Sequence, residues 1–336
     1  MTDPEPARNA AGSDPSPVSL QLKQSLEDLR LRRDKTRKKA LTVSFALFAV
    51  ILLGCLAFSA TAGDPAEAAG MFIGAFITSI VLSCVPYYLM MRGVKLQYKM
   101  LVVPAMLKEL DPGLAYDPGR FIQKEDFRQA KIFSQSIDSY KGEDLIHGTY
   151  RGIPIRFSEL TVQEEHTDGK NNHTYHTFFH GVFLIADFNK HFQYRHWVLP
   201  DTAEAAFGQV FGNFLQKLHL PGRGHMTRLE DPAFEKKFVV YTEDDVEARY
   251  ILTPKLMHTM VAMSDHFKKG VSKLAFAFLN SSVYIAIPIP NGRDLFEMPS
   301  HGEIGEAAAR RTQEELREIL RVFDVMDLDL RIWSKD

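Results

Sequence analysis

The stretch that decides the fold is ALTVSFALFAVILLGCLAFSATA, residues 40–62, with its near neighbour AAGMFIGAFITSIVLSCVPYYLMM, residues 68–91. Neither run contains a charged residue. At ~1.5 Å of rise per residue, each run as a helix is longer than the ~30 Å hydrocarbon core of a bilayer. Because only residues 63–67 separate the runs, we predict two transmembrane helices that form a hairpin. A buried hairpin in a soluble protein is the alternative, and the length and charge pattern disfavour it.

Basic residues flank the two apolar runs, whereas the short connection between them carries only Asp64 and Glu67. By the positive-inside rule this pattern places both termini in the cytosol, and we expect a bacterial inner-membrane protein. The basic flank should also attract anionic headgroups, so the lipid bilayer is the first expected partner. The basic residues before the first run are Arg30, Arg32, Arg33, Lys35, Arg37, Lys38 and Lys39, and those after the second run are Arg92, Lys95 and Lys99.

The charge balance and the cysteine positions exclude several classes of protein. The net charge is −2 and the pI is about 6.6, so the chain lacks the basic surplus that phosphate neutralisation requires, and we expect no nucleic-acid partner. Cys55 and Cys84 both lie in the apolar runs, which excludes a disulfide framework or a cysteine nucleophile in the soluble part. The sequence has no phosphate-binding loop, nucleophile elbow, H-E-x-x-H motif or dinucleotide fingerprint, and we expect no cofactor.

The composition divides the chain into five parts. Residues 1–18 predict a disordered tail, and residues 19–39 predict a basic amphipathic helix beside the membrane. Residues 40–91 are the transmembrane hairpin, residues 92–115 a stalk helix and turn, and residues 116–336 the cytosolic domain. The leucines of the juxtamembrane helix are Leu22, Leu26 and Leu29. We expect a solvated helix there, with pairing to a second copy or to the cytosolic part of the same chain as the alternatives.

Three residues of the second run are predicted to shape how it packs in the membrane. Gly70 and Gly74 form a small-xxx-small pair, which lets another helix approach closely. We expect that helix to be the first span of the same hairpin, and homodimerisation is the alternative. Pro86 removes a backbone donor and should kink the helix, with Ser83 positioned to satisfy the freed carbonyl.

Beyond residue 115 the pattern changes to strands joined by tight turns. Leu145–Tyr150 and Ile153–Glu159 flank Arg151-Gly152 as a predicted hairpin, and Phe178–Phe188 is strand-like with Gln193–Leu199 as its expected neighbour. Hairpins with interspersed helices favour a mixed α+β domain with a mainly antiparallel sheet. The other expected elements are a helix at Glu125–Ile132, a polar loop or extended hairpin end at Val162–Thr177, a helix at Asp201–Leu218, a strand at Phe234–Tyr241, a helical turn capped by Thr242, a helix that starts at Thr253-Pro254, a hairpin at Leu274–Leu279 and Val283–Ile289, a helix at Gly302–Met326 and a short strand at Leu330–Trp333.

Several blocks of this region resemble a bacterial membrane-anchored family catalogued as a domain of unknown function, DUF3137. The resemblance extends from about Tyr116 to the C-terminus, and it implies two membrane spans near the N-terminus. It implies no reaction, substrate or catalytic residue. The blocks that carry it include Gly142-Glu143-Asp144-Leu145-Ile146, Ala186-Asp187-Phe188-Asn189-Lys190, Val246-Glu247-Ala248-Arg249-Tyr250-Ile251-Leu252-Thr253-Pro254 and Leu330-Arg331-Ile332-Trp333.

Charged residues that interrupt apolar segments are the candidates for chemistry. Asp187, Glu159, Glu247 and Arg249 are the candidate catalytic residues, although a role in anchoring neighbouring loops through charge-assisted hydrogen bonds is favoured for Glu247 and Arg249. His176 and His180 are candidate metal ligands on one strand face. The other histidines nearby lack a recognised zinc spacing, so a solvated loop with incidental histidines is the favoured interpretation.

The leading functional hypothesis is a cytosolic domain that binds another protein, either in the membrane or in the cytosol, or a membrane-proximal ligand, without catalysis of its own. A membrane-tethered hydrolase or transferase that uses Asp187, Glu159, Glu247 or Arg249 is the competing hypothesis, and it requires these side chains to converge in one cleft. A transporter subunit ranks third, because neither span contains an ionisable residue of the kind that lines ion pathways.

Overall fold

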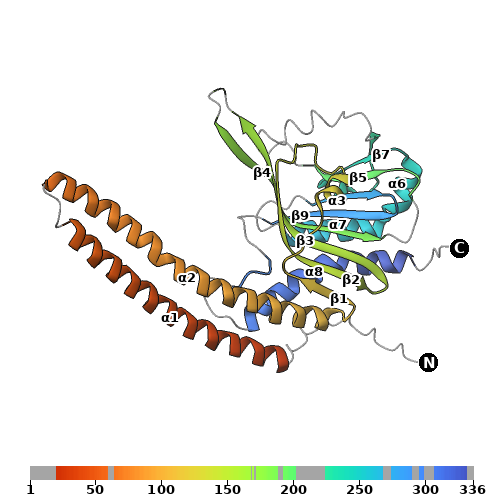
Figure 1. The fold of residues 1–336 in the computed structure, drawn as a ribbon. Helices are drawn as coiled ribbons and strands as arrows, with labels where there is room; N and C mark the ends of the chain where they lie inside the picture. The colour runs from red at the N-terminus through yellow and green to blue at the C-terminus, as the bar shows by residue number, and fades with distance from the viewer. Residues whose placement is uncertain are drawn as a thin grey trace.

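The computed structural model describes residues 20–59, 64–167, 169, 172–187, 192–201, 224–267, 274–289, 295–298 and 306–330. Two long apolar helices are followed by a mainly antiparallel sheet with helices packed on it, which confirms the predicted fold class (Figure 1). The predicted tail, residues 1–18, lies outside the described residues.

The N-terminal hairpin consists of α1, Leu20–Ser59, and α2, Pro65–Leu110. Both helices are long and apolar enough to cross a membrane. With 46 residues, α2 is ~69 Å long, more than twice the thickness of a hydrocarbon core, so a large part of it continues beyond any membrane span. The juxtamembrane helix and the first span are therefore one continuous helix, and so are the second span and the stalk.

Proline does not interrupt α2, which contains Pro86 and Pro104. The expected role of Ser83 is wrong, because its hydroxyl donates to the carbonyl of Ile80 at 2.8 Å and not to the carbonyl that Pro86 frees one turn earlier. At the start of α2, Asp64 caps the helix by accepting a hydrogen bond from the backbone N–H of Ala66 at 3.0 Å.

The base of α1 packs against the rest of its own chain. Leu22, Leu26 and Leu29 are buried, and they belong to the same core as Val94 and Tyr98 of α2. The expectation of a solvated helix is wrong here, and the alternative of packing on the cytosolic part of the same chain holds. The leucine stripe would otherwise expose apolar surface to water, and its burial stabilises the junction by roughly 1.5–3 kcal/mol per side chain.

The glycine pair of α2 does not face α1. A Cβ atom placed on Gly70 or Gly74 meets no atom of the described residues within 4 Å. The helices meet instead on the face that carries Ser79, which is fully buried, and Phe76, whose ring lies 6.1 Å from that of Phe48. The expected packing of the two glycines against the first span is therefore wrong, and homodimerisation, the alternative, stays a prediction.

Among the described residues, nine strands form one sheet in the order β1-β2-β3-β4-β9-β8-β5-β7-β6, with every neighbouring pair antiparallel. The hairpin around Arg151-Gly152 is confirmed as β2 and β3. The expected pairing of β4 with β5 is wrong, because β4 lies between β3 and β9. The strands are β1, Leu114–Asp117; β2, Ser139–Tyr150; β3, Ile153–Thr167; β4, His173–Asp187; β5, His196–Pro200; β6, His225–Thr227; β7, Phe238–Thr242; β8, Ala275–Leu279; and β9, Ser282–Pro288.

The helices α5, α6 and α7 each begin at a side chain that accepts a hydrogen bond from a free backbone N–H group. Thr253 caps α7 by accepting from Leu256, as its Thr-Pro signal predicts. Asp244, and not Thr242 as expected, caps α6 by accepting from Glu247. The expected helix at Asp201–Leu218 lies outside the described residues except for Asp201. Of the expected strand at Leu330–Trp333, Leu330 belongs to α8 and the other residues lie outside the described residues. The helices are α3, Lys124–Gln129; α5, Pro232–Glu235; α6, Asp245–Ile251; α7, Pro254–His266; and α8, Glu306–Leu330.

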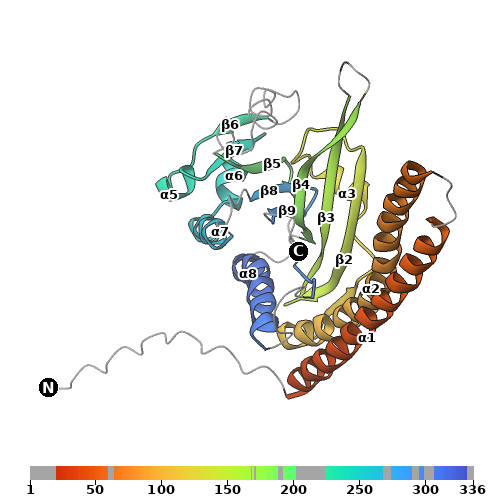
Figure 2. The ribbon, with the colours of Figure 1, turned by 90° about the vertical axis from the view of Figure 1, so that its left-hand side faces the viewer.

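Both faces of the sheet are buried. One face packs on the base of the hairpin and on α7 and α8, and the other packs on α3 and its neighbouring segments (Figure 2). Successive residues of β9 alternate between the two cores, with Val283, Ile285 and Ile287 on the hairpin side and Tyr284 and Ala286 on the other. The hairpin base and the sheet therefore share one continuous core.

The outer parts of β3 and β4 extend beyond this core as a two-stranded ribbon, which we call the arm: residues 163–167 and 173–177. Residues 173–177 are all exposed, and Tyr175 retains 54% of its surface. Of the two interpretations of this stretch, the extended hairpin end is correct and the polar loop is wrong. Figures 1 and 2 show that the arm rises from the sheet toward the same side of the molecule as the free end of the α1–α2 hairpin.

Candidate functional site

Glu247 lies on α6 and anchors the segment that leads into β5. Its carboxylate accepts hydrogen bonds from the backbone N–H groups of Gln193 at 3.0 Å and Tyr194 at 2.8 Å. It also lies 2.9 Å from Nε2 of His196, whose side chain has no exposed surface. Burial lowers the pKa of His196, and the Glu247 carboxylate opposes that shift. Glu247 therefore has the loop-anchoring role that the sequence favours.

Arg249 is also on α6 but contacts other segments. Its guanidinium donates to the backbone carbonyls of Asp245 at 3.2 Å and Arg228 at 3.4 Å. Glu247 and Arg249 therefore do not form an acid–base pair. Arg249 also lines a groove of about 510 Å³, whose lining residues are Leu229, Glu230, Asp231, Pro232, Arg249, Leu252, Pro254 and Met257.

The other two candidates lie on neighbouring strands. Asp187 is the half-buried last residue of β4 and pairs with Ser282 in the register. Glu159, on β3, is buried and accepts hydrogen bonds from the backbone N–H groups of Leu295 and Phe296. The hydrolase or transferase hypothesis needs all four candidates in one cleft, and Glu159, Glu247 and Arg249 each bind a different backbone segment. The hydrolase or transferase hypothesis therefore lacks the shared cleft that it requires.

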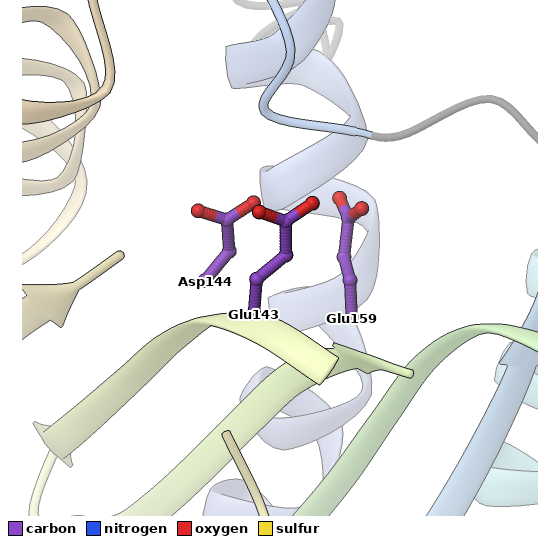
Figure 3. A group of neighbouring side chains, drawn as sticks. All are labelled: Glu143, Asp144 and Glu159. Carbon is purple, nitrogen blue, oxygen red and sulfur yellow. The ribbon is translucent and has the colours of Figure 1, made fainter. Parts of the chain in front are cut away.

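Glu159 belongs instead to a group of three carboxylates on the hairpin side of the sheet. Glu143 and Asp144 come from β2, and Glu159 pairs with Glu143 across the β2–β3 register. Figure 3 shows the three side chains pointing the same way from the two strands, and each offers an oxygen within 4.8 Å of the others. So close a group of negative charges is costly in a buried position unless a cation lies among them.

Lys99 supplies that positive charge from α2. Its ammonium Nζ lies 2.7 Å from Asp144 Oδ2 and 2.9 Å from Glu143 Oε2, and 3.5 Å from Glu297 Oε1. The Tyr116 hydroxyl of β1 donates a hydrogen bond to the second carboxylate oxygen of Asp144. We call these six residues the junction network: Lys99, Tyr116, Glu143, Asp144, Glu159 and Glu297. Its members come from the α1–α2 hairpin, three strands and the segment before α8.

Burial and neighbouring charges act in opposite directions on the pKa values of Asp144 and Lys99. Desolvation raises the pKa of Asp144 to about 6, although Lys99 and the Tyr116 hydrogen bond lower it. Burial alone would lower the pKa of Lys99, but the carboxylates of Asp144 and Glu143 outweigh it and the pKa rises. The pKa of Tyr116 is raised by burial and by the adjacent Asp144. At neutral pH, Lys99 is therefore charged and Tyr116 is a hydrogen-bond donor.

The backbone of β2 is shaped to direct Asp144 at Lys99. Asp144 has φ of 62°, in the left-handed region that costs a residue with a side chain of order 1 kcal/mol or more. It lies in the register shift between Glu143 and Ile146, and such bulges redirect side chains. The backbone N–H of Asp144 donates to the carbonyl of Pro118 at 3.2 Å, which holds the strained residue in place.

Chemically, this arrangement is an ion-pair junction between α2 and the sheet. The Lys99 ammonium lies in contact distance of two carboxylates, so the carboxylates bind a cation that the chain itself supplies. Lys99, Tyr116, Glu143, Asp144 and Glu297 are not among the residues that the sequence singled out for chemistry. The one feature of the sequence that points to this network is Lys99 itself, because it places a charge between Tyr98 and Val102, two positions of α2 that are buried.

The two candidate metal ligands lie on opposite faces of the β3–β4 hairpin. His176 pairs with Glu164 and His180 with Thr161, because the register shifts by one residue between them and leaves Phe178 as the extra residue. His180 Nδ1 lies 2.9 Å from Thr161 Oγ1, whereas the His176 ring meets that of His166 at 4.9 Å. The expected shared face of His176 and His180 is therefore wrong.

Residues 177–328, from the end of the arm into α8, match the family model described as "Protein of unknown function (DUF3137)". That segment is a DUF3137 domain. The match confirms the predicted family, over a shorter range than the expected Tyr116 to the C-terminus. Lys99, Tyr116, Glu143, Asp144 and Glu159 precede the matched segment, and no curated protein matches the chain.

One solved structure is similar to the chain, a crystal structure of the mycobacterial trehalose monomycolate transport factor A, TtfA. The similarity covers 65% of this chain and 92% of that chain, with 10% sequence identity and a TM-score of 0.30. At this score the likeness carries no argument about the DUF3137 domain.

Proposed function

We propose that this protein is a bacterial inner-membrane protein whose hairpin anchors a cytosolic domain, and that the domain binds an integral membrane protein beside the hairpin without catalysis of its own. The observation that carries the proposal is the direction of the arm, which extends toward the same side of the molecule as the free end of the apolar hairpin.

The junction between the hairpin and the domain supports a fixed orientation. The leucines of α1, the stalk part of α2 and the sheet share one core, and the junction network adds the buried Lys99–Asp144 ion pair and the partly buried Lys99–Glu143 pair across the same contact. Because interiors this closely packed do not deform continuously, the domain and the hairpin should move as one body. A fixed domain presents the same surface to the membrane at all times.

The composition of the arm favours a protein partner over an apolar lipid contact. The exposed side chains of residues 173–177 are His, Thr, Tyr, His and Thr, which offer hydrogen bonds and one aromatic anchor. Tyrosine is enriched at protein interfaces because it supplies apolar area and a polar end. The groove lined by Arg249 lies on other elements, so the arm is the surface that reaches the membrane side.

Site-specific photo-crosslinking in native membranes tests the proposal. A photoreactive phenylalanine analogue replaces Tyr175 on the arm or, as the matched control, Tyr250 on α6, which is 40% exposed. We expect Tyr175 to yield a discrete membrane-protein adduct and Tyr250 to yield none, because α6 lies at the far end of the sheet (Figure 1). Equal adducts from both positions, or adducts with lipid alone from Tyr175, would contradict the proposal.

A further inference from the structure

One face of the arm gathers three potential metal ligands. Glu164 of β3 pairs directly with His176 of β4, so the two side chains lie on the same face with Cβ atoms roughly 4.5–5.5 Å apart. His166 is two residues beyond Glu164 on β3 and therefore points to that face as well. Glu165 and His173 lie on the opposite face.

Two contacts link the three side chains, and His166 takes part in both. His166 Nε2 lies 3.2 Å from Glu164 Oε2. The rings of His166 and His176 have centroids 4.9 Å apart and meet edge to face, at an interplanar angle of 85°. The ligand atoms of the three residues do not all lie within 4.8 Å of one another, so metal binding requires the exposed histidine rings to rotate about χ1 and χ2 toward Oε2 of Glu164.

The neighbouring segment holds Glu164 in position. Its other oxygen, Oε1, accepts a hydrogen bond from the backbone N–H of Ser136 at 3.2 Å, and the Ser136 hydroxyl lies 3.0 Å from the same atom. Asp138 ties the same segment to the arm, because its carboxylate accepts from the backbone N–H of Glu165 at 2.8 Å. These contacts direct Oε2 of Glu164 toward His166, and residues that orient a ligand in this way are a regular part of metal sites.

We propose that Glu164, His166 and His176 bind a zinc ion on the exposed face of the arm. Two imidazole nitrogens and one carboxylate oxygen form a donor set that zinc adopts in proteins, with a fourth, tetrahedral position left for water or for a ligand from a partner. The ion would also replace the contact between His166 and Glu164 with bonds from both groups to one cation. The inference does not depend on the proposed function, because the site is complete within this chain.

The test is calorimetric titration of zinc chloride into the detergent-solubilised full-length protein, with any affinity tag removed and bound metal stripped by EDTA. We expect one zinc per chain. The double variant His166→Gln/His176→Gln lacks two of the three ligands, and its zinc affinity should fall by at least roughly 10–100-fold. That is the loss seen when a metal site loses only a residue that orients a ligand. His173→Gln, on the opposite face of the same arm, and His225→Gln, an exposed histidine on β6, are the matched controls and should bind as the wild type does.

Cobalt provides a second readout. A tetrahedral cobalt complex absorbs visible light far more strongly than a six-coordinate one, and we expect that absorption in the wild type and in His173→Gln but not in the double variant. The arm lies outside the core, so the variants should keep the wild-type melting temperature and a loss of binding would not reflect unfolding. Unchanged zinc affinity in the double variant, or an equal loss in His173→Gln, would overturn the assignment.

Discussion

Lys99 is a buried ammonium, and the two carboxylates nearest to it lie 44 and 45 residues further along the chain. Lys99→Met would leave Asp144, which has no exposed surface, without its counter-charge. Removing one partner of a buried pair costs about 3–5 kcal/mol, and we expect the free energy of unfolding to fall by that order in urea titrations of the solubilised protein.

Lys95→Met is the matched control for this prediction. Lys95 lies one turn earlier on α2 and pairs with Glu297 at 3.0 Å, but its side chain is 45% exposed. A solvated pair contributes about 0–1 kcal/mol, so this variant should unfold almost as the wild type does. If both variants lost the same stability, the buried Lys99–Asp144 pair would not be the source of the effect.

The pH dependence of stability is predicted from Asp144. Burial raises its pKa in the folded protein to about 6, above the ordinary value of 3.8, so the folded state binds this proton more tightly than the unfolded state. The stability that this bound proton contributes to the folded state is fully present below pH 3.8 and is lost as the pH rises through about 6. The difference between the two values corresponds to roughly 3 kcal/mol.

The measurement compares melting temperatures of the wild type and Asp144→Asn from pH 4 to pH 7.5. Asparagine does not titrate, so the advantage of the wild type over the variant should shrink as the pH rises through this window. Lys99 keeps its charge throughout, because its pKa is raised above an already high value. An advantage that grows with pH would show that the pKa of Asp144 is lowered, the reverse of the direction expected from its burial.

At the scale of the elements, local sequence signals predicted most of the helices and strands. The turn between β2 and β3 has Arg151 at φ 48° and Gly152 at φ 88°, which is the backbone that a tight hairpin requires. The Thr253-Pro254 signal for the start of α7 and the two apolar runs that predict the hairpin are also read from short stretches of sequence. Each of these signals acts within a few residues, so it can be recognised without knowing the rest of the fold.

Pairings between distant elements were not predictable in this way. Nothing in the pattern of β4 selects β9 as its neighbour, because β9 and the part of β4 that pairs with it are both apolar on both faces and β9 follows β4 by about a hundred residues. One extra residue at Phe178 placed His176 and His180 on opposite faces, and no local signal marks that bulge. The junction network was missed for the same reason, since Lys99, Asp144 and Glu297 meet only in the folded chain.

At the scale of the whole molecule, the arm and the free end of the hairpin lie toward the same side (Figures 1 and 2). If α1 and α2 cross the bilayer, the connection near Gly63 lies outside the cytosol, and the domain with its arm lies on the cytosolic surface. The basic residues that precede the first apolar run and follow the second favour this orientation. The arm would then face the inner leaflet next to the hairpin.

Reporter fusions provide the measurement. An alkaline phosphatase inserted at Gly63 should be active, because it folds only outside the cytosol, and a fluorescent protein fused after Asp336 should fluoresce, because it folds only inside. A fluorescent protein inserted at the β2–β3 turn, between Arg151 and Gly152, is the control and should behave like the C-terminal fusion, since both positions belong to the same domain. If Gly63 and the C-terminus were found on one side of the membrane, α1 and α2 would not be spans, and the arm would have no membrane to face.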